Sequence, residues 1–255
     1  MTLLDELKVF VKSVLNWIYT FVAFLVFFFS FGPKEITVLG HNYFLPVPAT
    51  DSFSVQIFNI IRRDLLPPGV QLVVTDPVSA FVSQILLSAL LAFFFTIPFF
   101  IYKIILYIQP ALLPSEKRAV LLAILPMVGL FFAGAAFSYY FLIPTPFKTL
   151  YPYAIAIEAM PFFSINEFIY YVGGLMIAVG LMFLLPVFMV LLSVMGIIPA
   201  VFWRRKWQYA LLFFLVLSAI ITPDGTGITM ITLFLPLMAL YLTGSIFANK
   251  LAKSV

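Results

Sequence analysis

The sequence predicts an all-α polytopic membrane protein with six transmembrane helices. Both termini lie on the cytoplasmic side, and the helices form a kinked, curved bundle with a cap on the outer side. Hydrophobic residues make up 64% of the 255 residues and charged residues only 9%, whereas a globular domain is roughly one quarter charged. The apolar residues form uncharged runs of roughly 18 or more, long enough to cross a bilayer. Lys and Arg are enriched in the connections on one side of the membrane, which predicts the orientation of the chain.

The spanning segments are predicted to be helices. Lipid offers no hydrogen-bond partner to the backbone, so a span is either a helix or part of a closed barrel. The runs here are continuously apolar and do not alternate, which favours helices. We predict one six-helix domain over residues 1–255, with spans at 13–33, 77–103, 119–144, 168–196, 207–222 and 226–249. The first run lacks a small-residue cleavage site and is too long for a signal peptide, so it is expected to remain in the protein.

The distribution of Lys and Arg sets the orientation. Ten of these 14 residues flank one set of helix ends, which includes both termini, and four flank the other set. Cytoplasmic connections carry the excess of basic residues, so both termini are expected inside. Seven of the ten acidic residues lie on the predicted outer side.

Two outer loops are expected, at residues 34–76 and 145–167. Within the first, Ser52–Leu66 carries apolar residues at helical spacing. This pattern predicts an amphipathic helix on the outer membrane surface or against neighbouring helices. The second loop is rich in proline and aromatic residues and is expected to cap the outer helix ends.

Proline also occurs inside the predicted spans, where it removes a backbone hydrogen bond and bends a helix. The positions are Pro98, Pro126, Pro186 and Pro236. Bent helices in a curved bundle are the first interpretation, and a moving hinge is the alternative.

The fifth span is short. Trp207–Ile221 has 15 residues, which makes a helix about 22 Å long, against a hydrocarbon core of about 30 Å. The link Thr222–Thr226 is a predicted tight turn, so the last two spans form a hairpin. We expect the outer tip of this hairpin to stop short of the outer surface and to thin the bilayer locally.

The sequence lacks the common motifs for metal binding, phosphate binding and ion pumping. There is no cysteine, and His41 is the single histidine, so thiolate and multi-histidine metal sites are excluded. No phosphate-binding loop occurs, and the spans contain almost no ionisable residue. The sequence therefore predicts neither an enzyme nor a primary pump, and no cofactor, metal or nucleic-acid partner.

One carboxylate stands out on the basic cytoplasmic face. Glu116 precedes Lys117 and Arg118 at the start of the third span. In one interpretation it complements the helix dipole and pairs with these neighbours; in the other it binds a guanidinium group as a bidentate partner. Glu6, on the amphipathic N-terminal segment, has the same two interpretations.

Several motifs follow one another in order along nearly the whole chain. They are Asp5–Lys8, Ile97–Tyr102, Gln109–Leu112, Glu116–Arg118, Gly134–Tyr140 with Pro144, Gly180–Phe183 with Pro186–Val187, Met195–Ile197 leading into Arg204–Lys206, and Ile221–Asp224. Together they resemble the TatC family, the core receptor subunit of the twin-arginine (Tat) protein translocase.

The resemblance implies Sec-independent export of folded proteins across the cytoplasmic membrane, driven by the proton-motive force. It implies binding of twin-arginine signal peptides at the cytoplasmic face, docking of single-span TatA- and TatB-type subunits along the last two spans, and self-association. The implied signal-peptide residues are Glu116, Glu6, Lys8, Tyr107, Pro110 and Arg118. The implied partner-docking residues are Thr222, Pro223, Asp224 and Thr229. Fixed charge and paired donors suit arginine to a carboxylate partner.

The sequence departs from the family pattern at polar positions. Leu184 stands where the fourth span usually carries Glu or Gln. The other departures are Leu3, Lys8, Phe10 and Lys103, and Ile228 or Thr229 where the first turn of the sixth span usually carries Gln. Some of the polar contribution is therefore expected to come from Thr222 and Thr229.

There are two alternative hypotheses for the function. A secondary transporter for a small solute would show inverted repeats and broken, polar helices at the midplane, but no clear repeat is visible and the midplane is apolar. A purely structural membrane scaffold is the third hypothesis. Gly173, Gly174 and Gly244 are interpreted as sites of close helix packing.

Overall fold

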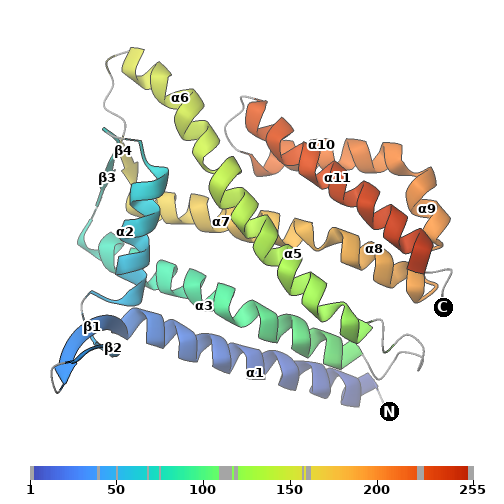
Figure 1. The fold of residues 1–255 in the computed structure, drawn as a ribbon, viewed down its shortest axis with the longest axis horizontal. Coiled ribbons are helices and arrows are strands. Elements are labelled where there is room, and N and C mark those ends of the chain that lie inside the picture. Colours follow the sequence, from blue (N-terminus) through green and yellow to red (C-terminus); the bar gives the residue numbers. More distant parts are fainter. Residues whose placement is uncertain are drawn as a thin grey trace. The chain divides into compact units, whose positions relative to one another are not determined.

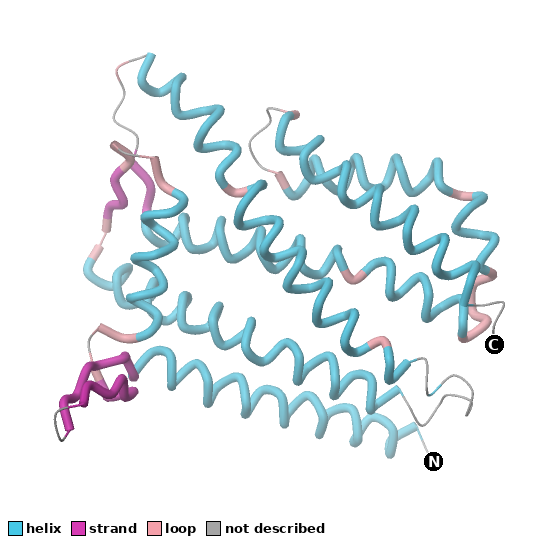
Figure 2. Tube along the Cα trace, viewed as in Figure 1, coloured by secondary structure: helices cyan, strands magenta, loops and turns pink. Residues whose placement is uncertain are grey.

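The fold was determined as a computed structural model. The described residues are 3–38, 41–49, 51–67, 69–74, 76–108, 117, 120–156, 158, 162–222 and 227–251. In this part of the chain, five helices are long and apolar enough to cross a membrane. A further apolar helix, Trp207–Ile221, is shorter. The predicted fold class, a mostly helical protein with several membrane spans, is confirmed (Figures 1 and 2).

The elements follow one another in a simple order. They are α1 (Leu3–Ser30), β1 (Phe31–Val38), β2 (His41–Pro48), α2 (Phe53–Leu65), β3 (Gln71–Val73), α3 (Pro77–Ile108), α5 (Ile124–Phe137), η2 (Ser138–Leu142), α6 (Pro144–Ala156), β4 (Phe162–Ser164), α7 (Ile165–Phe183), α8 (Leu185–Val194), α9 (Ala200–Arg205), α10 (Trp207–Ile221) and α11 (Ile228–Leu251).

The described chain groups into two compact units. Unit 1 is Met1–Lys103 with Ala154–Gly173, and unit 2 is Ile104–Tyr153 with Gly174–Val255. The sequence pattern had predicted a single domain. Because α3, α6 and α7 each contribute residues to both units, hydropathy along the chain offers no boundary between them.

In unit 1, aromatic rings join α1 to α3. The rings of Trp17 and Phe100 lie 4.7 Å apart, and those of Phe28 and Phe95 lie 5.0 Å apart. The residue number of the contacting ring increases along α1 while that of its partner decreases along α3, so the two helices are antiparallel. Tilted rings at these distances add to the packing energy of the pair.

The first outer connection contains regular structure. The predicted amphipathic helix is confirmed, because α2 covers nearly the same residues. The strands β1 and β2 form an antiparallel hairpin in which Phe31 pairs with Pro48 and Val38 with His41. Sequence reasoning missed this hairpin, since it used the prolines of this segment only as turn signals. The β-branched and aromatic residues on either side of Gly40 are the signal that was available.

Polar side chains attach the start of α2 to its neighbours in unit 1. The amide nitrogen of Gln84 on α3 donates to the Ser52 hydroxyl at 3.1 Å and to the Phe29 carbonyl oxygen at 3.4 Å. The hydroxyls of Ser52 and Ser54 lie 2.8 Å apart, and both residues are fully buried. The buried Ser52 and Ser54 hydroxyls therefore have partners, which hold the start of α2 against α3 and the end of α1.

Two prolines begin helices at points where the predicted spans and the observed helices differ. The fourth span, expected at 168–196, is interrupted at Leu184, and α8 begins at Leu185 with Pro186 in its first turn. Proline lacks the N–H that would continue the ladder of helical bonds, and its fixed φ suits the start of a helix. Pro144 acts in the same way: it begins α6, so the chain after the third predicted span continues as helix where loop was expected.

Two glycines set the closest helix contacts in unit 2. A Cβ on Gly134 would lie 2.8 Å from the Val179 carbonyl oxygen of α7, and one on Gly244 would lie 2.9 Å from the Pro186 Cα of α8. The predicted role of Gly244 in close packing is confirmed. Gly173 also allows close packing, against Leu90 in unit 1. A Cβ on Gly174, in contrast, would meet nothing within 4 Å.

Candidate functional site

The predicted signal-peptide residues are only partly described. Lys8 is exposed on α1, and Tyr107 is half-buried in the last turn of α3. Glu6 lies within α1, but its side chain is outside the described part. Glu116, Pro110 and Arg118 lie outside the described residues altogether. Lys8 belongs to unit 1 and Tyr107 to unit 2, so the structure does not test whether these residues meet.

The predicted short hairpin is α10 followed by α11, which pack against each other in unit 2 (Figure 1). α10 has 15 residues, as expected, and is about 22 Å long. α11 has 24 residues and continues through Pro236. Helix α10 is thus shorter than the hydrocarbon core by several ångströms.

Helix α10 is buried along one narrow stripe. Phe214 and Ser218, one turn apart, are its buried residues, and Thr222 continues the stripe at the C-terminal cap. The other faces are apolar and exposed, and Ile220 reaches 73% exposure. A helix that is apolar on all sides belongs in lipid or against other helices.

The predicted docking threonines are buried at the two ends of the hairpin link. The Thr222 hydroxyl donates to the Ser218 carbonyl oxygen at 2.8 Å. Thr229, in the first turn of α11, is 1% exposed. Pro223 and Asp224, between them, lie outside the described residues. Because the Thr222 proton is already donated within α10, this hydroxyl can offer a partner only its lone pairs.

Sequence reasoning missed Ser218. Its side chain is fully buried, and its hydroxyl has no hydrogen-bond partner among the described residues. The available signal was the four-residue spacing from Ser218 to Thr222, which places two hydroxyls on one face of an otherwise apolar helix.

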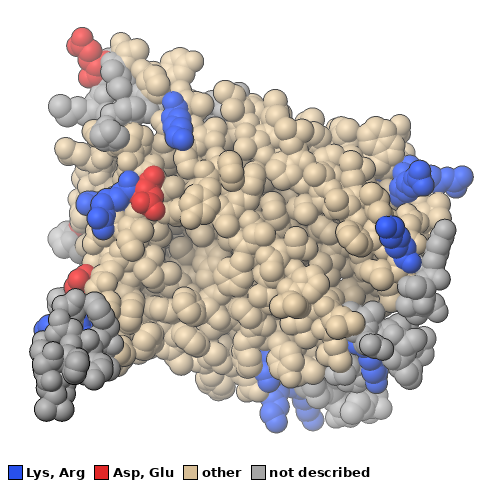
Figure 3. All heavy atoms as spheres, in the orientation of Figure 1, with Lys and Arg blue, Asp and Glu red and all other residues tan. Residues whose placement is uncertain are grey.

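At the opposite end of the hairpin, a hydrogen-bonded aromatic cluster joins α8, α9 and α11. The Trp203 indole nitrogen donates to the Ser193 hydroxyl at 2.9 Å. The Tyr241 hydroxyl donates to the Trp203 carbonyl oxygen at 2.6 Å. Next to this cluster, basic side chains gather over α9, and the surface along α10 and α11 away from that end is uncharged (Figure 3). The cluster therefore holds the basic end of α9 in place.

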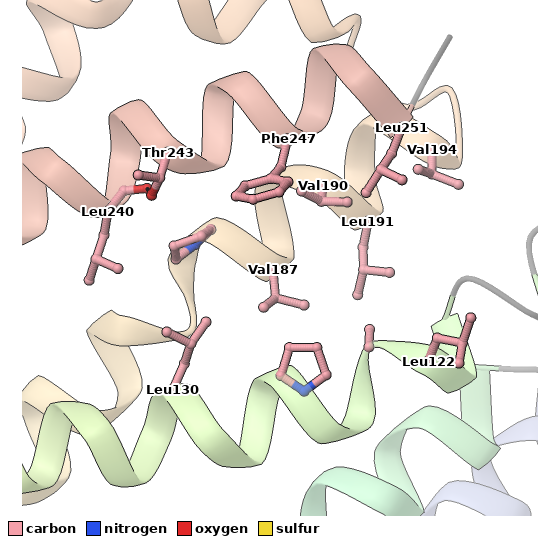
Figure 4. Close-up of a pocket in the computed structure, with 13 residues that line it drawn as sticks. Leu122, Leu130, Val187, Val190, Leu191, Val194, Leu240, Thr243, Phe247 and Leu251 are labelled. Carbon is pink, nitrogen blue, oxygen red and sulfur yellow. Dashed lines mark hydrogen bonds between the residues drawn. The ribbon is translucent and has the colours of Figure 1, made fainter. Parts of the chain in front are cut away.

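An apolar groove of about 560 Å³ runs between α5, α8 and α11 of unit 2 (Figure 4). Leu122 lines it from just before α5, Leu130 from α5, Val187 and Leu191 from α8, and Phe247 from α11. The hydroxyl of Thr243 is its single side-chain polar atom, and this hydroxyl donates to the Leu240 carbonyl oxygen at 2.9 Å. Among the described residues, the side chains of the groove consequently offer a ligand no free hydrogen-bond donor.

Leu184, which departs from the family pattern, is buried at the break between α7 and α8 and is 5% exposed. Its carbonyl oxygen accepts from the amide nitrogens of Val187 at 3.0 Å and Phe188 at 3.2 Å. An apolar side chain at this position avoids burying a charge in the interior of the unit. No group of three or more His, Asp or Glu that could hold a metal occurs among the described residues.

These features define a class: a multi-pass helical membrane protein with uncharged spans, a basic end and a short exposed hairpin. Comparison with known proteins identifies the family within this class. The family described as "Sec-independent protein translocase protein (TatC)" matches residues 3–236. The chain belongs to the TatC family, a component of protein transport located in the cytoplasmic membrane.

Relatives and solved structures agree with this assignment. The TatC protein of Cenarchaeum symbiosum is 33% identical over 248 residues, covering 97% of this chain and 93% of that protein. The TatC protein of Aquifex aeolicus is 30% identical over 203 residues, covering 78% and 83%. A crystal structure of the twin-arginine translocase receptor TatC matches with a TM-score of 0.73 and 26% identity, covering 97% of this chain and 99% of that chain.

Proposed function

We propose that this protein is the receptor subunit of a twin-arginine translocase. It binds the twin-arginine motif of signal peptides at its cytoplasmic face and docks single-span TatA- and TatB-type subunits on α10 and α11. Folded cargo then crosses the membrane at the expense of the proton-motive force. The observation that carries the proposal is the family match over residues 3–236, and the apolar, uncharged spans support it.

Recognition of the peptide rests on the carboxylates Glu116 and Glu6. Each arginine of the motif carries a fixed charge and paired N–H donors, which a carboxylate accepts in bidentate geometry. Lys8, Tyr107, Pro110 and Arg118 are proposed to shape the same site. A Lys-Lys motif keeps the charge but loses the fork of donors, so the site discriminates by geometry more than by charge.

Docking of the single-span partners rests on the exposed faces of α10. This helix presents apolar side chains on all sides except its buried stripe. A partner helix of ordinary length gains packing area there, in the manner of membrane helix association. Thr222, Pro223, Asp224 and Thr229 are proposed to set the position of the partner at the outer end.

Photocrosslinking tests the receptor function. A photoreactive residue replaces Lys117, next to Glu116, and the full chain in membranes receives a signal peptide with Arg-Arg or Lys-Lys. We expect the Arg-Arg peptide to crosslink and the Lys-Lys peptide to lose most of the signal. Glu116→Gln should weaken the Arg-Arg crosslink at least tenfold. A tenfold change corresponds to roughly 1.4 kcal/mol, just below the range of about 1.5–3 kcal/mol for a hydrogen bond to a charged group.

Glu158→Gln is the matched control, because Glu158 is an exposed carboxylate on the predicted outer side. It should leave the crosslink unchanged. Equal crosslinking of the two peptides would contradict the receptor function.

A further inference from the structure

The apolar groove of unit 2 is about as long as one leaflet of a membrane is thick. On α11 its lining runs from Leu240 to Leu251, a rise of about 16 Å. This is close to half of a hydrocarbon core of about 30 Å. Leu122, Val194 and Leu251 mark one end of the groove, and Leu130 and Leu240 the other (Figure 4). The groove thus has the depth of a single leaflet.

The groove reaches the basic end of unit 2. Leu251 is at the end of α11 and is preceded by Lys250, which is exposed. Lys250 is seven residues, about two helical turns, after Thr243, so the two side chains leave α11 on nearly the same side. Lys250 does not itself line the groove, but it is adjacent to Leu251, which does. By the distribution of Lys and Arg, this end lies in the cytoplasmic headgroup region.

The charge at this end favours an anion. The described residues of unit 2 include six cations and no Asp or Glu: Lys117, Lys148, Arg204, Arg205, Lys206 and Lys250. All of these except Lys148 lie on the predicted cytoplasmic side. Basic pockets between helices on this side of a membrane protein bind the headgroups of anionic lipids.

We infer that the groove between α5, α8 and α11 binds an anionic phospholipid of the cytoplasmic leaflet. One acyl chain lies along Val187, Leu191 and Phe247, and the phosphate lies near Lys250. The volume of about 560 Å³ is within the range of roughly 300–1,000 Å³ found for small-molecule sites. This inference does not depend on the proposed function, because it requires neither a signal peptide nor a single-span partner.

Two adjacent residues of α11 provide a matched test. Thr243 and Leu242 are both exposed, but only Thr243 lines the groove. Thr243→Trp fills the groove, whereas Leu242→Trp places the same ring on the neighbouring lipid-facing surface. The delipidated full chain is titrated with dioleoyl phosphatidylglycerol or dioleoyl phosphatidylcholine, and bound lipid is counted by native mass spectrometry.

We expect one retained phosphatidylglycerol, bound about fivefold more tightly than phosphatidylcholine, as one lysine contributes roughly 1 kcal/mol. Thr243→Trp should lower the binding affinity for both lipids about tenfold, since the acyl chain loses its enclosed site. Lys250→Gln should remove the preference for phosphatidylglycerol, and Lys148→Gln, at the other end, should not. Thermal unfolding confirms that each variant is folded.

Two results would overturn the inference. One is an equal loss of lipid in Thr243→Trp and Leu242→Trp, because it would mean that the retained lipid is spread over the helix surface. The other is a photocrosslink from position 247 in intact membranes that captures a polypeptide and no lipid. In that case an apolar peptide, and not an acyl chain, occupies the groove.

Discussion

Single residues set how closely the helices of unit 2 approach. Gly134 and Gly244 lie where a side chain would contact the backbone of a neighbouring helix. In lipid the hydrophobic effect does little to draw helices together, so close backbone contact supplies much of the association energy. Adding a single methyl group at either glycine should therefore lower the stability of the protein.

Gly244→Ala should destabilise the protein by about 1–3 kcal/mol, the usual penalty for overpacking. The new Cβ would lie 2.9 Å from the Pro186 Cα and 3.0 Å from the Met189 sulfur, so α8 and α11 must separate. The free energy of unfolding is measured by titration with a denaturing detergent. Gly129→Ala is the control, since a Cβ there meets nothing within 4 Å, and it should be neutral or stabilising. Equal destabilisation by both variants would contradict the packing at Gly244.

Trp203→Phe should destabilise unit 2 by about 1 kcal/mol, because Ser193 loses its hydrogen-bond partner. A double-mutant cycle with Ser193→Ala should show a coupling energy of about 0.5–1.5 kcal/mol. Trp207→Phe provides the control, since Trp207 is exposed on α10. A coupling energy near zero would mean that the bond from Trp203 to Ser193 adds nothing to stability.

Among the elements, α10 is the one whose length does not match a membrane. Its 15 residues reach about 22 Å, and its buried stripe against α11 fixes its position along that helix. A short span is accommodated by a thinner bilayer or by packing against partners. Local thinning at the hairpin tip therefore remains a prediction of this geometry.

Bilayer thickness should control the stability of the hairpin. In vesicles with 14-carbon acyl chains we expect slower hydrogen exchange in α10 than in vesicles with 20-carbon chains, because the mismatch is smaller. A variant with four residues inserted after Ile221 lengthens the helix by about 6 Å and should shift the optimum toward the thicker bilayer. Exchange that does not respond to thickness in either protein would argue against thinning.

For the whole molecule, the orientation in the membrane remains a prediction from the Lys and Arg distribution. Ten of 14 basic residues flank the predicted inner side, and the proposed peptide site and the lipid groove both depend on this assignment.

Single-cysteine labelling should establish the orientation. The chain contains no cysteine, so each introduced thiol is unique. Lys148→Cys, exposed on α6, should react with a membrane-impermeant maleimide in intact cells. Arg205→Cys, exposed on α9, should react only after the membrane is opened. The reverse pattern would invert the orientation and place the proposed peptide site outside.

The sequence by itself determined the fold class, the short fifth span, the amphipathic helix α2 and the family. Each of these depends on local composition, helical period or motif order, and all three can be determined directly from the sequence. Glu116, the residue on which peptide recognition depends most, was also identified from sequence, and its role stays a prediction because it lies outside the described residues.

Only the tertiary structure decided which residues meet. The bond from Gln84 to Ser52 and the groove beside Lys250 join residues that are far apart in sequence, and the burial of Ser218 depends on a neighbouring helix. In a chain that is apolar almost throughout, hydropathy separates membrane from water but not lipid-facing from buried surface. That second distinction depends on side-chain packing, which exists only once the helices are in contact.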